Sequence, residues 1–186
     1  MKPEILSEND GYAIRFGVPE DAENYYIQGF GTFDPEIARL TGSKPYYSRE
    51  EVIPFFMHSL TDQSRRFFLI VDPDGKIIGE SVINEIEWDV RCANFRICLF
   101  HPEKLGIGIG TWVTTFTRDY AFEVLHLHRL ELDVFSFNPR AKAVYEKAGF
   151  RVEGVRREAI WDGEKYADDI LMAILEDEWK AIKAED

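Results

Sequence analysis

The sequence contains the glycine-rich stretch Leu105-Gly106-Ile107-Gly108-Ile109-Gly110-Thr111 between two regular segments. An apolar run from Phe95 to Phe100 precedes it and predicts a β-strand, and the amphipathic segment after it predicts a helix to about Leu125. Glycines at alternate positions let the backbone turn sharply and leave several N–H groups uncovered. Those donors, with the positive end of the helix dipole behind them, predict a seat for a phosphate or diphosphate.

A second motif follows about thirty residues later. It reads Phe137-Asn138-Pro139-Arg140-Ala141-Lys142-Ala143-Val144-Tyr145-Glu146-Lys147-Ala148-Gly149-Phe150. Asn138 suits a helix N-cap, Pro139 suits the first helical position, and Gly149 suits the position after the last turn. Upstream, residues 129–135 predict a strand, and one face of it carries Leu130, Leu132 and Val134.

The order of strand, glycine turn, helix, strand and Asn-capped helix resembles the core of the Gcn5-related N-acetyltransferase (GNAT) superfamily. The family's loop reads Gln/Arg-x-x-Gly-x-Gly/Ala, and residues 105–110 match it except that Leu105 replaces Gln or Arg. The resemblance implies an α/β (α+β) GNAT fold: a single mixed, mostly antiparallel central sheet with a splayed pair of parallel strands, flanked by helices. We expect one N-acetyltransferase domain over residues 1–186, with acetyl-CoA as co-substrate.

The resemblance also implies which residues contact acetyl-CoA. The loop amides would hold the diphosphate, and the backbone of Leu99 and Phe100 would pair with the pantetheine arm as another strand does. Asn138 would contact that arm besides capping its helix, and Thr111 would either donate a hydroxyl to a phosphate or only occupy the first helical turn. The full cofactor set is Leu99, Phe100, Leu105, Gly106, Ile107, Gly108, Ile109, Gly110, Thr111, Asn138, Ala141 and Tyr145.

Acetyl transfer to an amine needs an acid for the leaving thiolate. A thiol has a pKa of about 8.5, and a tyrosine, with a pKa near 10, can supply the proton. The resemblance assigns this role to Tyr145, one helical turn beyond Ala141 on the face that would border the cofactor. The alternative is a buried tyrosine that packs its ring and satisfies its hydroxyl locally.

The reaction also needs a base, because an alkyl ammonium of pKa about 10.4 loses its proton at pH 7 at a cost of roughly 4–5 kcal/mol. Many relatives place a glutamate on the central strand, where this chain has Asn94. Glu85, on the preceding strand, is the best acidic alternative, and Glu80 and Glu87 stay open. Each of these could instead be a solvated surface carboxylate. His101, at the strand end, is better explained as a surface or loop-supporting residue.

Within the superfamily the chain is most similar to the ribosomal-protein-N-terminal and spermidine acetyltransferase branch. Glu85 falls on a polyamine-side carboxylate position of the spermidine enzymes, but Val82 and Asn94 replace two others. We therefore expect transfer to a primary amine of a small molecule, peptide or protein N-terminus, with a polyamine acceptor as one alternative. A non-catalytic acetyl-CoA-binding module is the other alternative. Because dimers are common in this branch, a homodimer stays open.

Composition agrees with a single folded enzyme domain, and we expect no metal. The 186 residues are 45% hydrophobic, which suffices for one core. The net charge of −12 argues against a nucleic-acid partner, and no apolar run approaches the roughly 20 residues that cross a membrane. Residues 1–4 lack a signal-peptide pattern, and Cys92 and Cys98 lie too far apart on one strand to bridge, so we expect a cytoplasmic protein.

The rest of the chain predicts a first strand at Tyr12–Phe16, a helix from Pro19 through Ile27 and irregular structure from Phe30 to Tyr47 that would line the acceptor cleft. Ser48 with Glu51 predicts a capping box. Further strands are expected at Arg66–Val71, Lys76–Ile86, Cys92–Phe100, Arg151–Arg157 and Tyr166–Leu175, with a short terminal helix carrying Trp179.

Overall fold

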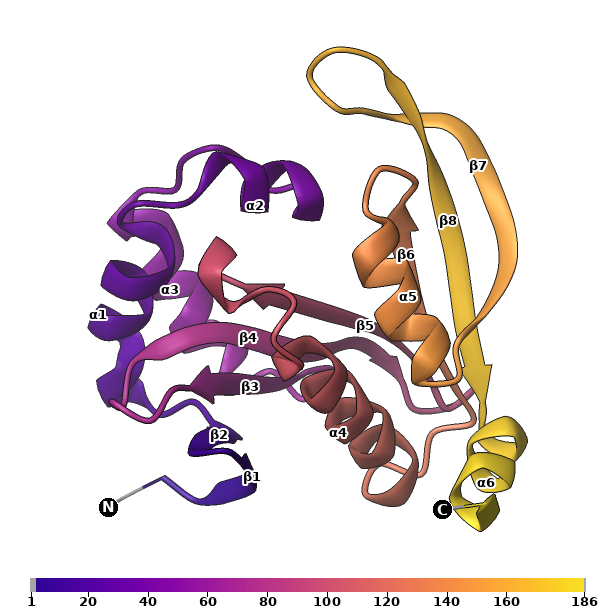
Figure 1. Cartoon of the computed structure of the whole chain (residues 1–186). Coiled ribbons are helices and arrows are strands. Elements are labelled where there is room, and N and C mark those ends of the chain that lie inside the picture. The colour runs from indigo at the N-terminus through magenta and orange to yellow at the C-terminus, as the bar shows by residue number, and fades with distance from the viewer. Residues whose placement is uncertain (1–2, 186) are drawn as a thin grey trace. The chain divides into compact units, whose positions relative to one another are not determined.

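A computed structural model describes residues 3–185, which form an eight-stranded sheet flanked by helices (Figure 1). The strand order is β1-β2-β3-β4-β5-β6-β8-β7. The strands are β1 (Ile5–Asn9), β2 (Tyr12–Phe16), β3 (Arg66–Val71), β4 (Ile77–Glu87), β5 (Cys92–Leu99), β6 (Arg129–Phe135), β7 (Arg151–Trp161) and β8 (Tyr166–Leu175). The helices are η1 (Pro19–Asp21), α1 (Ala22–Tyr25), η2 (Tyr26–Phe30), α2 (Pro35–Thr41), α3 (Arg49–Ser59), η3 (Pro102–Lys104), α4 (Ile109–Glu123), α5 (Pro139–Lys147) and α6 (Glu176–Glu185).

The sheet is mixed and mostly antiparallel, with β5 and β6 as its parallel pair. This confirms the predicted fold class. By its internal contacts the chain divides into two compact units, Met1–Val82 with Ile97–Val113 and Ile83–Arg96 with Thr114–Asp186. Strands β4 and β5 and helix α4 each supply residues to both units. That the whole chain works as one domain remains a prediction.

The first unit is built on the antiparallel strands β1, β2 and β3. β3 is buried from Phe67 to Val71, and its register pairs Ile14 with Ile70. The predicted hairpin from β3 to β4 is confirmed, since Asp72 N–H donates to the Lys76 carbonyl (2.9 Å) and closes the turn. Strand β1 was not predicted, because its alternation is weak and its two ends are exposed.

An aromatic cluster forms the core of the first unit. The ring of Tyr25 lies 4.6 Å from that of Phe56 and 5.9 Å from that of Phe100, centroid to centroid. The predicted helix after Pro19 forms as η1, α1 and the π-helical turn η2, and the capping box of Ser48 with Glu51 is confirmed. Tyr25 of α1 therefore stacks on Phe56 of α3 and meets the Phe100 ring edge-on.

The prediction of irregular structure from Phe30 to Tyr47 was wrong, because helix α2 lies within it. Asp34 caps this helix by accepting from the Glu36 and Ile37 amides at 2.8 and 3.0 Å. Pro35 occupies the first turn, and Gly42 ends the helix at a φ of 66°. The proline and glycine that suggested broken structure mark the two ends of a short helix instead.

The second unit is built on β6, β8 and β7, which pair antiparallel, while the start of β5 pairs with β6 in parallel. Among the described residues this parallel pairing covers only Cys92–Asn94 with Arg129–Glu131. Leu130, Leu132 and Val134 are buried, as the alternation predicts. β7 is an exposed edge strand that forms a long ribbon with β8 (Figure 1).

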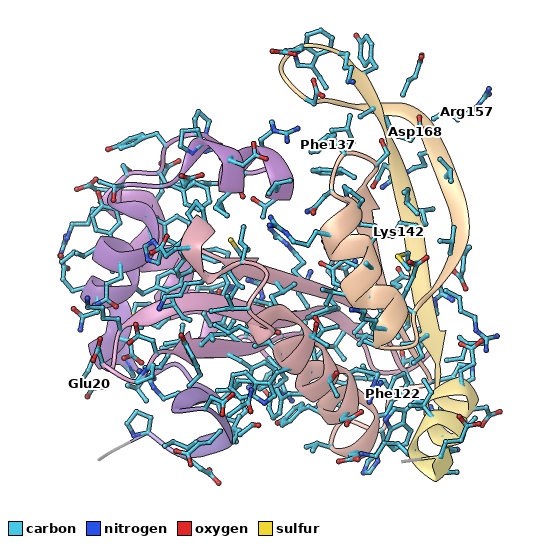
Figure 2. All side chains as sticks on the ribbon, in the orientation of Figure 1. Glu20, Phe122, Phe137, Lys142, Arg157 and Asp168 are labelled. Carbon is cyan, nitrogen blue, oxygen red and sulfur yellow. The ribbon has the colours of Figure 1, made fainter. Side chains whose placement is uncertain are left out.

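Side chains of α4 in the second unit contact the residue that follows α5 and helix α6. Arg118, only 4% exposed, donates from Nη1 to the Ala148 carbonyl at 2.9 Å. Asp119 accepts from Nε1 of Trp179 at 3.0 Å, and the Trp179 ring stacks on Phe122 of α4, which is labelled in Figure 2. Within residues 3–185, no helix is both long enough and apolar enough to cross a membrane.

Candidate functional site

The glycine loop has an exposed backbone at the start of α4. Gly106 and Gly108 adopt φ values of 78° and 94°, and a side chain built on either would meet no atom within 4 Å. Trp112 N–H donates to the Gly108 carbonyl (3.1 Å), which starts the helix, so the preceding amides are those that a helix leaves without an intrahelical partner. The loop therefore offers amide donors and open space, which fits an anionic group.

The side chain of Leu105 explains why the loop tolerates a departure from the family pattern. Leu105 is half-buried and packs against the aromatic cluster of the first unit. An apolar anchor thus holds the start of the loop where the family has Gln or Arg.

At the end of β5, the main-chain N–H and C=O of one residue point away from β4 and could pair with the predicted pantetheine arm. Phe100 N–H donates to the Ile78 carbonyl (2.9 Å), so this amide already bonds β4, and the Phe100 ring is buried in the core. Main-chain groups of successive strand residues point to opposite edges, so those of Leu99 point away from β4. Pairing of Leu99 and Phe100 with the pantetheine arm stays a prediction, and the main chain of Leu99 is the one that points away from β4.

Helix α5 carries the residues of the second motif. Asn138 Oδ1 accepts from the Ala141 amide at 3.2 Å, which confirms the predicted N-cap, and Gly149 follows the helix at a φ of 94°. Tyr145 is 9% exposed and its ring centroid lies 6.0 Å from Phe95 and 6.1 Å from Phe150. Phenylalanine rings therefore fix the orientation of the tyrosine ring.

We expect Asn138→Ala to lower the free energy of unfolding by about 1 kcal/mol, because one amide of the first turn loses its cap. Asn138→Asp is the matched control, since aspartate caps equally well. Urea unfolding followed by circular dichroism measures both. Equal stability of the alanine and wild-type proteins would contradict a stabilising cap.

The basic side chains near the two motifs are partly neutralised. Lys104 Nζ lies 3.6 Å from Asp72 Oδ2, and Lys142, labelled on α5 in Figure 2, forms an ion pair with Glu146. Arg140 and Lys147 are exposed. The loop amides are therefore the better supported anion donors in this chain.

The acidic residues of β4 differ in their surroundings. Glu85 is exposed and adopts a left-handed φ of 54°, an irregularity inside the strand, and Glu87 is exposed as well. Glu80 accepts a hydrogen bond from the hydroxyl of the fully buried Tyr25. Glu85 is thus the carboxylate of β4 that both reaches solvent and sits at a strained backbone position.

The sequence interpretation missed the polar face of the second unit's sheet. Glu131 and Asp133 on β6 lie opposite the face of its buried leucines, and Asp169 on β8 is 1% exposed. The alternation of β6 was the available signal, because it places its charged residues on one face as surely as its leucines on the other. The alternation of β6 alone does not predict that Asp169 shares this face, because that depends on the pairing of β6 with β8.

The chain matches known proteins over most of its length. The family model described as acetyltransferase (GNAT) domain matches residues 14–151. Spermidine N(1)-acetyltransferase of Vibrio cholerae is 32% identical over 73% of this chain and 78% of that protein. The Escherichia coli K12 protein of that name is 32% identical over 78% and 77%. A crystal structure of the Vibrio cholerae enzyme with CoA and spermine has a TM-score of 0.81 at 28% identity, covering 92% of this chain and 99% of that one.

Proposed function

Since this chain belongs to the GNAT acetyltransferase family and is an N-acetyltransferase, we propose that it moves the acetyl group of acetyl-CoA to a primary amine of a small molecule, peptide or protein N-terminus. The observation that carries the proposal is the glycine loop, whose backbone is open to an anion at the start of α4. The amine attacks the thioester directly, without a covalent intermediate on the protein.

Each predicted contact then has a task. The amides of Gly106, Ile107, Gly108, Ile109, Gly110 and Thr111 hold the diphosphate, and Leu105 anchors this loop. The main chain of Leu99 pairs with the pantetheine arm, and Asn138 and Ala141 border the co-substrate from the first turn of α5. These contacts orient the thioester, and orientation is a large part of what such an enzyme supplies.

Tyr145 is the proposed acid. A thioester supplies an activated acyl group, and its sulfur must leave as a thiol. The Tyr145 hydroxyl gives its proton to that sulfur, and its ring, packed on Phe95 and Phe150, holds the hydroxyl in one direction.

A polyamine is the second candidate acceptor. The two relatives described above are named spermidine acetyltransferases, and one of them is seen with spermine. The net charge of −12 favours the approach of a polycation. Val82 and Asn94 occupy two positions where that branch has carboxylates, so we place the polyamine second.

An amine panel tests the proposed function. The protein is incubated with acetyl-CoA and either spermidine, simple alkyl amines or peptides with free N-termini, and the release of free thiol is recorded. We expect amine-dependent thiol release with at least one class. The class with the highest kcat/KM identifies the acceptor, and release at the background rate with every class would contradict the proposal.

We expect Glu85→Gln to raise KM for a cationic acceptor by about three- to tenfold and to leave kcat within about twofold, because an exposed carboxylate adds attraction rather than chemistry. Glu87→Gln is the matched control, two residues along the same strand and also exposed. An unchanged KM for Glu85→Gln would leave that residue as a solvated surface carboxylate.

We further propose a cytoplasmic enzyme that assembles with copies of itself. A structure of the Vibrio cholerae relative is described as dodecameric, and β7 of this chain is an exposed edge strand. The predicted homodimer is the smallest such assembly. Light scattering on the purified protein gives the mass of the particle.

A further inference from the structure

Two aspartates share one face of the sheet in the second unit. The register pairs Phe135 with Asp169 and Asp133 with Leu171, so Asp133 and Asp169 are diagonal neighbours on β6 and β8. Side chains two residues apart on a strand point to the same face, and long side chains at diagonal positions reach one another. The two carboxyl groups are close enough to share a hydrogen bond when one of them is protonated.

The buried member of the pair has an oxygen without a donor. Asp169 is 1% exposed; its Oδ2 accepts from Arg156, whereas its Oδ1 has no hydrogen-bond partner. With both carboxylates ionised, each offers only acceptors, so Oδ1 of Asp169 stays unsatisfied. A proton held between the pair removes this cost, as does the ammonium of a ligand. The pair of carboxyl groups therefore favours the binding of a proton or of a ligand's ammonium.

The surroundings of Asp133 favour a proton acceptor that solvent can reach. Asp133 is exposed, yet partial loss of hydration raises its pKa above the ordinary value, and the charge of Asp169 raises it further. Arg156 on β7 and Arg96 on β5 act in the opposite direction. Arg96 lies on β5, next to β6, and Arg156 lies on β7, beyond β8, so positive charge acts on Asp133 from both sides of its strand.

Asp133 and Tyr145 lie on opposite faces of the same sheet. In the parallel pair Asn94 is the partner of Glu131, so Arg96 and Asp133, each two residues further on, share the polar face. Phe95, between Asn94 and Arg96, points to the other face and contacts the Tyr145 ring. Among residues 3–185 the pairing of β5 with β6 ends at Asn94 and Glu131. The two strands are therefore not paired beside Arg96 and Asp133.

We propose that Asp133, positioned by Asp169 and Arg156, takes the proton from the acceptor's ammonium group, on the sheet face opposite the acid Tyr145. The proposal rests on the proposed function and supplies a base in a chain whose central strand carries Asn94 where many relatives have a glutamate. Asp133 is the catalytic residue here, and Asp169 and Arg156 are positioning residues.

The protons balance. Asp133 accepts one proton from R–NH₃⁺, and the free lone pair forms the C–N bond to the thioester carbon as the C–S bond breaks. Tyr145 gives its proton to the departing sulfur and regains one from the nitrogen, which loses its second proton as the amide forms. Asp133 then releases its proton to solvent, which its exposure permits. The sum is ammonium plus thioester giving amide, thiol and one proton.

The pH profile of Asp133→Asn tests the proposal. We expect kcat/KM for an alkyl amine to fall about 100-fold at pH 7 and then to rise about tenfold per pH unit, because only the spontaneously neutral amine reacts. The wild-type profile levels off above the pKa of Asp133. Glu131→Gln, which removes a carboxylate from the same strand and face, is the control and should keep the wild-type profile. A deficit of constant size at every pH, or none, overturns the proposal.

The two positioning residues should move the acid limb of the wild-type profile in opposite directions. Activity requires the Asp133 carboxylate, so it falls as pH drops through the Asp133 pKa. Asp169→Asn removes a negative neighbour, lowers that pKa and shifts the limb to lower pH. Arg156→Gln removes a positive neighbour and shifts the limb to higher pH. Shifts of the same sign, or no shifts, contradict the pair.

A titration of the free protein separates this inference from the proposed function. Carbon-13 NMR of labelled aspartate carboxyl groups follows Asp133 without acetyl-CoA, and Asp169→Asn should lower its pKa. If the wild-type protein releases no thiol with any amine, the proposed function fails, and the titration still decides whether the carboxylates interact. If Asp169→Asn does not fold, Asp133→Asn and Arg156→Gln, both at exposed positions, decide.

Discussion

Tyr145→Phe is expected to lower kcat by about 100- to 1000-fold at neutral pH while the Kd for CoA stays within about twofold. The substitution removes the hydroxyl that protonates the leaving sulfur and keeps the ring that packs on Phe95 and Phe150. Thiol release with the best acceptor gives kcat, and calorimetry with CoA gives Kd.

The pH dependence of this variant sharpens the test. Above about pH 8.5, the ordinary pKa of a thiol, the sulfur leaves without a proton, so the deficit should narrow. Tyr166→Phe is the control, because Tyr166 is 64% exposed on the ribbon of β7 and β8. A rate equal to that of the wild type at every pH would remove Tyr145 from the acid role.

Gly108→Ala is expected to weaken binding of CoA by about tenfold or more. An alanine at a φ of 94° is strained, and the loop relaxes by turning its amides away from their common direction. The built side chain meets no atom within 4 Å, so the loss arises from backbone conformation rather than from a clash. Calorimetry with CoA measures the change.

Two comparisons isolate the diphosphate contact. Gly75→Ala places alanine at a φ of 81° in the β3–β4 turn, also without a neighbour. Both alanine variants should lose roughly 1 kcal/mol of stability, but Gly75→Ala should leave CoA affinity unchanged. Acetyl-pantetheine lacks the diphosphate, so Gly108→Ala should not change its KM. Full CoA affinity in Gly108→Ala would place the diphosphate elsewhere.

Local signals predicted much of the fold. The Ser48 capping box, the Asn138 cap and the Asp72 to Gly75 turn each depend on residues a few positions apart, and all three are confirmed. Helix α2 and strand β1 were missed for different reasons. Proline and glycine at the ends of α2 are equally compatible with loops, and β1 gains its structure only by pairing with β2.

In the candidate site, too, some features follow from the local sequence and others only from the tertiary structure. The sequence by itself determined the glycine loop and its following helix, the Asn-capped helix that carries Tyr145, and the family, because these depend on backbone preferences between near neighbours. Only the tertiary structure decided that Leu105 anchors the loop in an aromatic core, that the Phe100 amide bonds β4, and that Asp133 meets Asp169. Such contacts join residues far apart in the chain, and strand register, which depends on packing across the whole sheet, sets them.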